Sequence, residues 1–157
     1  MNLRNRPYRR LAALLFSLAC WPLLALGQDL SLPGLAWVSF NEADFTRPRE
    51  TGVDAKIEID TGTKFNTYSQ FWSGYLKVPF SGAIALEAEA DNGLRLTLNG
   101  KTVIDGWAPE GARAATIAAK AGELLPLRLE YFQDGGQGFL RLFWKWEGQA
   151  REIIPAS

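Results

Sequence analysis

The sequence predicts an all-β protein, an antiparallel β-sandwich or barrel of about eight to ten short strands. Three observations support this fold class. Short segments alternate apolar and polar residues, Gly, Pro and Asn-Gly turns separate them, and no segment has the apolar period of a long helix. With 157 residues, the chain is expected to contain one domain.

The clearest strand pair lies in the middle of the chain. Leu94, Leu96 and Leu98 recur at every second position, which is the pattern of a strand buried on one face. Asn99-Gly100 follows, and this dipeptide favours the positive φ angles of a two-residue hairpin. We therefore predict a hairpin whose return strand carries Val103 and Ile104.

Further strands are predicted on both sides of this hairpin. They span residues 36–41, 54–60, 71–78, 83–90, 114–119, 125–132, 140–146 and 151–154. Residues 45–53, 61–70 and 106–113 lack strong periodicity and are predicted to be loops. Loops on a rigid β scaffold are where binding residues concentrate.

The N-terminus has the pattern of a secretory signal peptide. A basic segment without acids precedes an apolar run over residues 11–26, and small residues precede a predicted cleavage site between Gly27 and Gln28. We predict a signal peptide over 1–27, a short linker over 28–33 and the domain over 34–157. The alternatives are an uncleaved anchor and lipidation of Cys20. The mature protein is expected to be secreted, periplasmic or at the cell surface, with no transmembrane span.

Composition excludes several classes of chemistry. The chain has no His and one Cys, which excludes a Ser-His-Asp triad, a Cys-His pair and the usual zinc site. All 17 acids but only 13 of the 17 bases follow residue 27, so the mature chain has a net charge of about −4. That charge argues against nucleic-acid binding, which needs a basic face.

Five blocks in order resemble the PA-fourteen (protective-antigen) β-sandwich domain family. They are Gly34–Phe45, the stretch from Val53 to Asp60, the Phe-Trp-Ser-Gly-Tyr-Leu strand of 71–76, the Asp-Asn-Gly to Gly-Trp stretch of 91–107, and Glu130–Gly136. The resemblance covers the chain from about Gly34 to Pro155. It implies a β-sandwich, and the family's recurrent role implies that the chain binds carbohydrate.

The resemblance also implies a metal site. In adhesin-like members, two adjacent aspartates joined by a cis peptide hold a calcium ion that also contacts sugar hydroxyls. The equivalent pair here is Asp91 and Asn92, in which an amide replaces the second acid. The amide keeps an oxygen ligand but removes charge, which weakens calcium binding. Asp134, in a second glycine-rich turn, completes the predicted Ca²⁺ site if the two turns meet. The alternative is that both segments are ordinary tight turns.

Two aromatic residues are candidate sugar contacts. Trp107 opens the 106–113 loop and Tyr68 lies in the predicted 61–70 loop, where an indole or phenol ring could stack on a sugar. Trp107 has the alternative of packing in the core, as predicted for Trp72, Trp144 and Trp146, which lie within alternating strands.

Together these patterns predict an exported, non-catalytic carbohydrate-binding module whose partner is a glycan or polysaccharide. Glu87 and Glu89 share one strand face, but their alternation with core residues is typical of a solvated face and not of a glycosidase acid pair. The alternative is a non-catalytic protein-interaction or structural module of a cell-envelope assembly.

Overall fold

A computed structural model describes residues 33–62 and 67–155. The described chain forms eleven strands and confirms the predicted all-β class. In chain order they are β1 (Leu35–Phe40), β2 (Pro48–Asp54), β3 (Glu58–Gly62), β4 (Thr67–Lys77), β5 (Gly82–Asp91), β6 (Gly93–Leu98), β7 (Lys101–Gly106), β8 (Ala114–Ala119), β9 (Leu124–Asp134), β10 (Gly138–Trp146) and β11 (Gln149–Ile153). The predicted signal peptide lies outside the described residues, as does the linker apart from Pro33.

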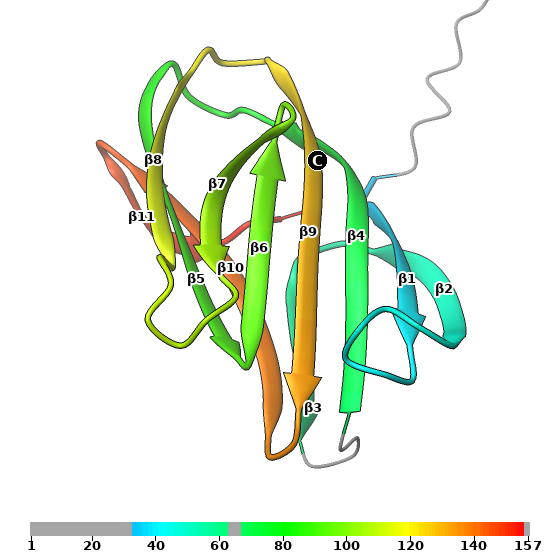
Figure 1. The fold of residues 1–157 in the computed structure, drawn as a ribbon. Helices are drawn as coiled ribbons and strands as arrows, with labels where there is room; N and C mark the ends of the chain where they lie inside the picture. Colours follow the sequence, from blue (N-terminus) through cyan, green and yellow to red (C-terminus); the bar gives the residue numbers. More distant parts are fainter. Residues whose placement is uncertain (1–32, 63–66, 156–157) are drawn as a thin grey trace, which may run out of the picture. The chain divides into compact units, whose positions relative to one another are not determined.

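The strands form two antiparallel sheets that pack face to face (Figure 1). One sheet has the order β2-β1-β4-β9-β6-β7, and the other has the order β11-β10-β5-β8, with β3 also pairing with β10. Successive strands β5 and β6 belong to different sheets, so the chain crosses between the sheets at Asn92. Within the described residues, no helix is long and apolar enough to cross a membrane.

The core lies between the sheets and is built from the alternating residues predicted to face inward. Leu94, Leu96 and Leu98 of β6 are buried, and Asn99 and Gly100 have positive φ angles of 49° and 75°, as the hairpin requires. Fully burying each large apolar side chain contributes about 1.5–3 kcal/mol. The core therefore fixes which residues of every strand face solvent.

Two predicted boundaries are wrong. Residues 45–53 were expected to form a loop, but β2 occupies Pro48–Asp54 and pairs with β1. The predicted strand 54–60 is divided between the end of β2 and the start of β3. The reason is that β2 is an exposed edge strand, held by backbone hydrogen bonds to β1, so its sequence lacks an apolar alternation.

A single carboxylate joins the edge of the first sheet to its centre. Asp54, at the end of β2, accepts a hydrogen bond from Trp37 Nε1 at 3.0 Å and another from Trp72 Nε1 at 2.8 Å. Trp72 is fully buried in β4, and Trp37 packs against the core from β1. Each carboxylate oxygen therefore satisfies an indole donor that would otherwise lack a partner.

We predict that Asp54→Ala lowers the free energy of unfolding by about 2–4 kcal/mol, because two indole N–H groups lose a charged acceptor. Asp54→Asn keeps one acceptor oxygen and should lose about half as much. Urea denaturation followed by tryptophan fluorescence measures both. Equal stability of Asp54→Ala and the parent would show that these two hydrogen bonds contribute nothing.

Candidate functional site

The candidate site is centred on the turn from Ala90 to Gly93, where the chain crosses between the sheets. A cis peptide bond joins Asp91 to Asn92. The Asn92 N–H donates to the carbonyl of Phe132 at 3.2 Å, and the Asn92 side-chain oxygen accepts the N–H of Asp134 at 2.7 Å. These bonds attach the turn to the end of β9, so the two glycine-containing turns lie together.

Side chains from two other segments hold three successive carbonyls of this turn. Arg113 donates through Nη1 to the Ala90 oxygen at 3.1 Å and through Nη2 to the Asn92 oxygen at 2.9 Å. Tyr131, buried in β9, donates its hydroxyl to the Asp91 oxygen at 2.6 Å. The turn's backbone is therefore fixed by groups of the chain itself.

A pocket of about 270 Å³ opens beside the turn. Its walls come from three segments: the turn, the 106–113 loop, which includes Arg113, and the end of β9. The lining residues are Asp91, Asn92, Trp107, Pro109, Arg113, Phe132 and Asp134. Four of the residues predicted for the site from sequence, Asp91, Asn92, Trp107 and Asp134, thus line one pocket.

Gly93 makes the close approach of these walls possible. A Cβ atom at this position would collide with the Phe132 ring and lie 2.8 Å from the Trp107 carbonyl oxygen. Any larger side chain would push the two aromatic walls away from the turn. The third residue of the Asp-Asn-Gly motif is therefore required by packing around the pocket.

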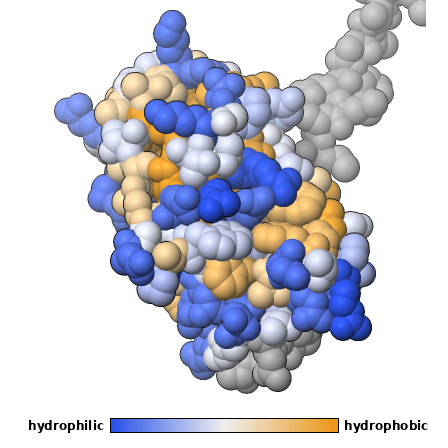
Figure 2. All heavy atoms as spheres, viewed as in Figure 1, coloured by the Kyte–Doolittle hydropathy of each residue, from blue (hydrophilic) through white to orange (hydrophobic). Residues whose placement is uncertain are grey.

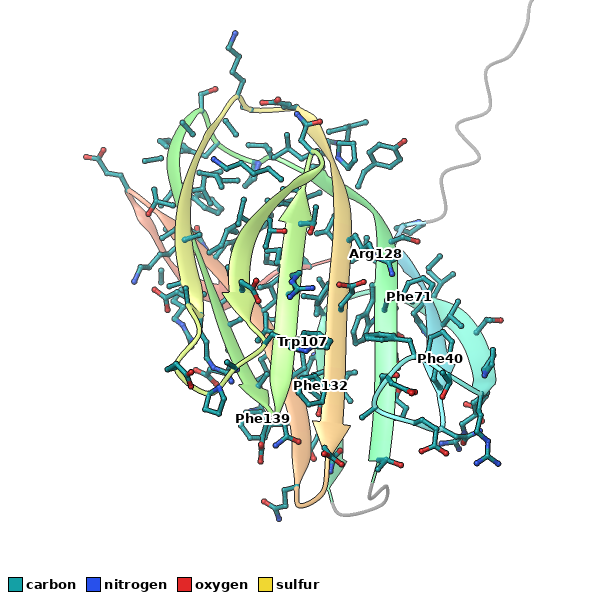
Figure 3. All side chains as sticks on the ribbon, viewed as in Figure 1. Phe40, Phe71, Trp107, Arg128, Phe132 and Phe139 are labelled. Carbon is teal, nitrogen blue, oxygen red and sulfur yellow. The ribbon has the colours of Figure 1, made fainter. Side chains whose placement is uncertain are left out.

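Trp107 is half-buried and lies outside the core cluster between the sheets. Its ring centroid is 4.6 Å from that of Phe132 and 6.0 Å from that of Phe45, and the Arg95 guanidinium lies 5.1 Å from it (Figure 3). Trp107 thus belongs to an aromatic group on the solvent-facing side of the six-stranded sheet. Its packing in the sandwich core, one of the two predicted alternatives, is not observed.

The prediction that Tyr68 is an exposed stacking residue is wrong. Tyr68 lies in β4, which begins at Thr67, and only 7% of it is exposed. Its hydroxyl bonds to the side-chain oxygen of Gln70, and burial raises the pKa of Tyr68 to about 12. The 61–70 segment was expected to be a loop because it lacks strong periodicity. The structure shows that polar Gln70, two positions after Tyr68 in β4, is itself buried and so interrupts the apolar alternation of that strand.

The carboxylates of Asp91 and Asp134 are available to a ligand. Neither has a hydrogen bond or ion pair in the part of the chain that the structure describes. Together with the Asn92 side-chain oxygen, which keeps one lone pair, they offer oxygen ligands of the kind Ca²⁺ prefers. These two carboxylates and one amide oxygen are fewer than the six to eight oxygens that Ca²⁺ takes, and the described ranges contain no group of three or more His, Cys, Asp or Glu able to hold a metal.

The other acid pair has a different environment. Glu87 forms ion pairs with Lys145 at 2.5 Å and with Arg151 at 2.8 Å, and Glu89 pairs with Arg151 at 2.6 Å. Hydrogen bonds from Lys145 and Arg151 lower the pKa of Glu87. A glycosidase acid would need a raised pKa, so this pair is a charged surface network.

Sequence reasoning missed Arg113, Tyr131, Phe132 and Pro109. Arg113 and Pro109 fall within the 106–113 segment that was predicted to be a loop, but nothing in the sequence indicated which carbonyls Arg113 would bind. Tyr131 and Phe132 were predicted only as alternating strand residues. Their roles depend on which strands neighbour β9, and local periodicity contains no information on that pairing.

Comparison with known proteins identifies the family. The family model described as "PA14 domain" matches residues 27–157. The anti-sigma-I factor RsgI3 of Acetivibrio thermocellus is 29% identical over 133 residues, which cover 79% of this chain and 21% of that protein. The chain therefore spans about a fifth of this curated relative.

Two solved structures have similar folds. An anti-sigma factor domain-containing protein from Clostridium clariflavum is 30% identical with a TM-score of 0.75, over 80% of this chain and 46% of that one. A structure described as the PA14 sugar-binding domain from an RTX adhesin is 18% identical with a TM-score of 0.63, over 81% of this chain and 99% of that one. The latter likeness establishes the fold alone.

We predict that Arg113→Gln and Tyr131→Phe each lower the free energy of unfolding by about 1–3 kcal/mol, because carbonyls of the turn lose their donors. Amide hydrogen exchange should accelerate at Asn92 and Gly93 first. The exposed Arg47, which pairs with Glu42, is the control, and Arg47→Gln should change stability by less than about 0.5 kcal/mol. Unchanged exchange at the turn in both site variants would contradict the assigned contacts.

We also predict a loss of stability in alkali. Burial raises the pKa of Tyr68 to about 12 and raises that of Tyr131 as well, whereas both titrate near 10 when unfolded. The unfolded state then releases protons first, so these tyrosines favour unfolding as the pH rises above 10. Denaturant midpoints at pH 8 to 11 measure this effect. The decline should be smaller in Tyr131→Phe, and an equal decline would assign the effect to other groups.

Proposed function

The chain belongs to the PA14 domain family, and we propose that it is an exported, non-catalytic module that binds carbohydrate in the pocket beside the Asp91–Asn92 turn. One observation carries this proposal: two unpaired carboxylates and two half-buried aromatic rings line the same pocket. Sugars present hydroxyls and apolar C–H faces together, so they match a pocket of this composition.

Known relatives support the proposal without deciding it. A fold neighbour is described as a sugar-binding domain, and the more similar relatives are anti-sigma factors of which this chain matches only a part. Adhesins and such factors fit a domain displayed at a cell surface or outside the cell. A protein-interaction or structural role in the cell envelope is the alternative that the binding experiment tests.

Calcium is part of the proposal as a weakly held ion. Asp91, Asn92 and Asp134 would hold it, and the bound ion would supply coordination to sugar hydroxyls. Arg113 would retain its hydrogen bonds to the carbonyls of Ala90 and Asn92, and its remaining N–H groups could donate to a ligand in the pocket. Trp107 and Phe132 would cover the apolar face of the sugar. The positive charge of Arg113 beside the turn disfavours a tightly bound cation.

We predict that millimolar calcium raises the melting temperature relative to chelator. A concentration ten times the Kd stabilises the folded state by about 1.4 kcal/mol, or roughly 4 °C for a domain of this size. Asp91→Asn and Asp134→Asn should remove the shift, whereas Asp60→Asn, at an exposed position on β3 that does not line the pocket, should keep it. No shift in the parent protein would remove calcium from the proposal.

We predict that Asn92→Asp strengthens calcium binding about tenfold, because a second adjacent carboxylate adds charge at nearly constant shape. The new carboxylate can still accept the Asp134 N–H, so the turn should keep its structure. Isothermal titration calorimetry with calcium measures the change.

A glycan array probed with the parent protein and with Asp91→Asn tests carbohydrate binding itself, and an array without any signal would favour the protein-interaction alternative.

A further inference from the structure

A continuous chain of contacting aromatic rings runs from the pocket over the outer side of β1 and ends at Phe71 on β4, the strand that neighbours β9. We call it the aromatic ladder, and its members are Phe71, Phe40, Phe45, Trp107 and Phe132. Successive ring centroids are 5.9 Å apart for Phe71–Phe40, 5.7 Å for Phe40–Phe45, 6.0 Å for Phe45–Trp107 and 4.6 Å for Trp107–Phe132. Figure 3 shows the four labelled members across β1, β4, β9 and the end of β7.

The ladder is not part of the core. None of its five rings belongs to the apolar cluster between the sheets, because Phe40, Phe71 and Phe132 lie on the outer side of β1, β4 and β9. Phe45, Phe71, Trp107 and Phe132 are half-buried, and only Phe40 is buried, beneath its neighbours. Figure 2 shows apolar surface on this face where Figure 3 labels Phe71 and Phe132.

Polar groups along the ladder are balanced in charge. Arg128 lies 4.3 Å from the Phe71 ring centroid and pairs with Glu130 at 2.8 Å. Arg95 lies over Trp107 and pairs with Asp105 at 3.4 Å and Glu130 at 4.0 Å. The surface thus combines aromatic rings, two of which have a guanidinium group over them, with hydrogen-bonding groups whose charges balance.

We propose that the aromatic ladder continues the pocket as a surface for successive sugar residues of one neutral polysaccharide chain, an inference that rests on the proposed carbohydrate binding. Two observations select this occupant. Trp107 and Phe132 line the pocket and begin the ladder, so one ligand reaches both. The balanced charge matches a neutral polymer, and ring faces beside polar groups match sugar C–H faces beside hydroxyls. The ligand is then a chain and not a single terminal sugar.

The test uses Phe71→Thr, at the end of the ladder furthest from the pocket along the ring contacts. Thr suits an exposed strand position. The control is Phe143→Thr, which removes a buried phenylalanine on the outer side of β10 that also lies under an arginine, Arg151, at 3.3 Å. Circular dichroism confirms that both variants fold.

Affinity electrophoresis in gels containing β-glucan, xyloglucan, galactomannan or dextran sulfate identifies a polymer that retards the protein. Calorimetry then measures the affinity for oligosaccharides of two to six residues from that polymer.

The proposal predicts retardation by a neutral polymer and affinity that rises about tenfold from disaccharide to hexasaccharide. Phe71→Thr should remove most of that rise without changing the affinity for the disaccharide. Asp91→Asn should lower the affinities for both the disaccharide and the hexasaccharide, and Phe143→Thr should change neither affinity. A rise that persists in Phe71→Thr, or that Phe143→Thr removes equally, would overturn the ladder. So would retardation by dextran sulfate alone. If short glycans bind on the array but no polymer retards the protein, the proposed binding along the aromatic ladder is wrong and the proposed binding in the pocket stands. If no glycan of any kind binds, both proposals are wrong.

Discussion

The candidate site depends on the way the turn at Ala90–Asn92 is held. Arg113 and Tyr131 donate to three carbonyls in succession, and the Asp134 amide donates to the Asn92 side chain. Among the residues that the structure describes, none forms a hydrogen bond or ion pair with the carboxylates of Asp91 and Asp134, because backbone and amide groups satisfy the turn. A site prepared in this way needs little rearrangement when a ligand arrives, and such preorganisation lowers the cost of binding.

The position of β9 explains how these contacts meet. This strand pairs with β4 on one side and β6 on the other, and its alternation places Tyr131 inward beneath the turn and Phe132 outward beside Trp107. One strand therefore supplies a donor for the turn and an aromatic wall for the pocket, and its end supplies Asp134. The outward-facing Phe132 lines the pocket and also belongs to the aromatic ladder, so the two proposed binding surfaces share this strand.

Most of the fold was predictable because a strand buried on one side has apolar residues at every second position. The β6–β7 hairpin could be predicted without knowing its neighbouring strands, from the alternation of Leu94, Leu96 and Leu98 and from the Asn99-Gly100 turn. The edge strand β2 was missed because backbone pairing, not burial, holds it, and Tyr68 was misplaced because buried Gln70 broke the apolar pattern. The three oxygen-bearing side chains of the site were found from turn residues. The contacts of Arg113 and Tyr131 join positions about 20 and 40 residues apart. Local periodicity in the sequence does not predict contacts at such separations.

A ligand that binds at the turn held by Arg113 and Tyr131 should shift the NMR signals of that turn, and a ¹H–¹⁵N correlation spectrum titrated with a glycan found on the array measures these shifts. The largest shifts are expected at the amides of Asn92, Gly93 and Asp134 and at the indole N–H of Trp107. The indole signals of Trp37 and Trp72, which are bonded to Asp54, should stay in place. Shifts centred on the charged face around Glu87 and Arg151, with the Trp107 indole unmoved, would contradict binding at this turn.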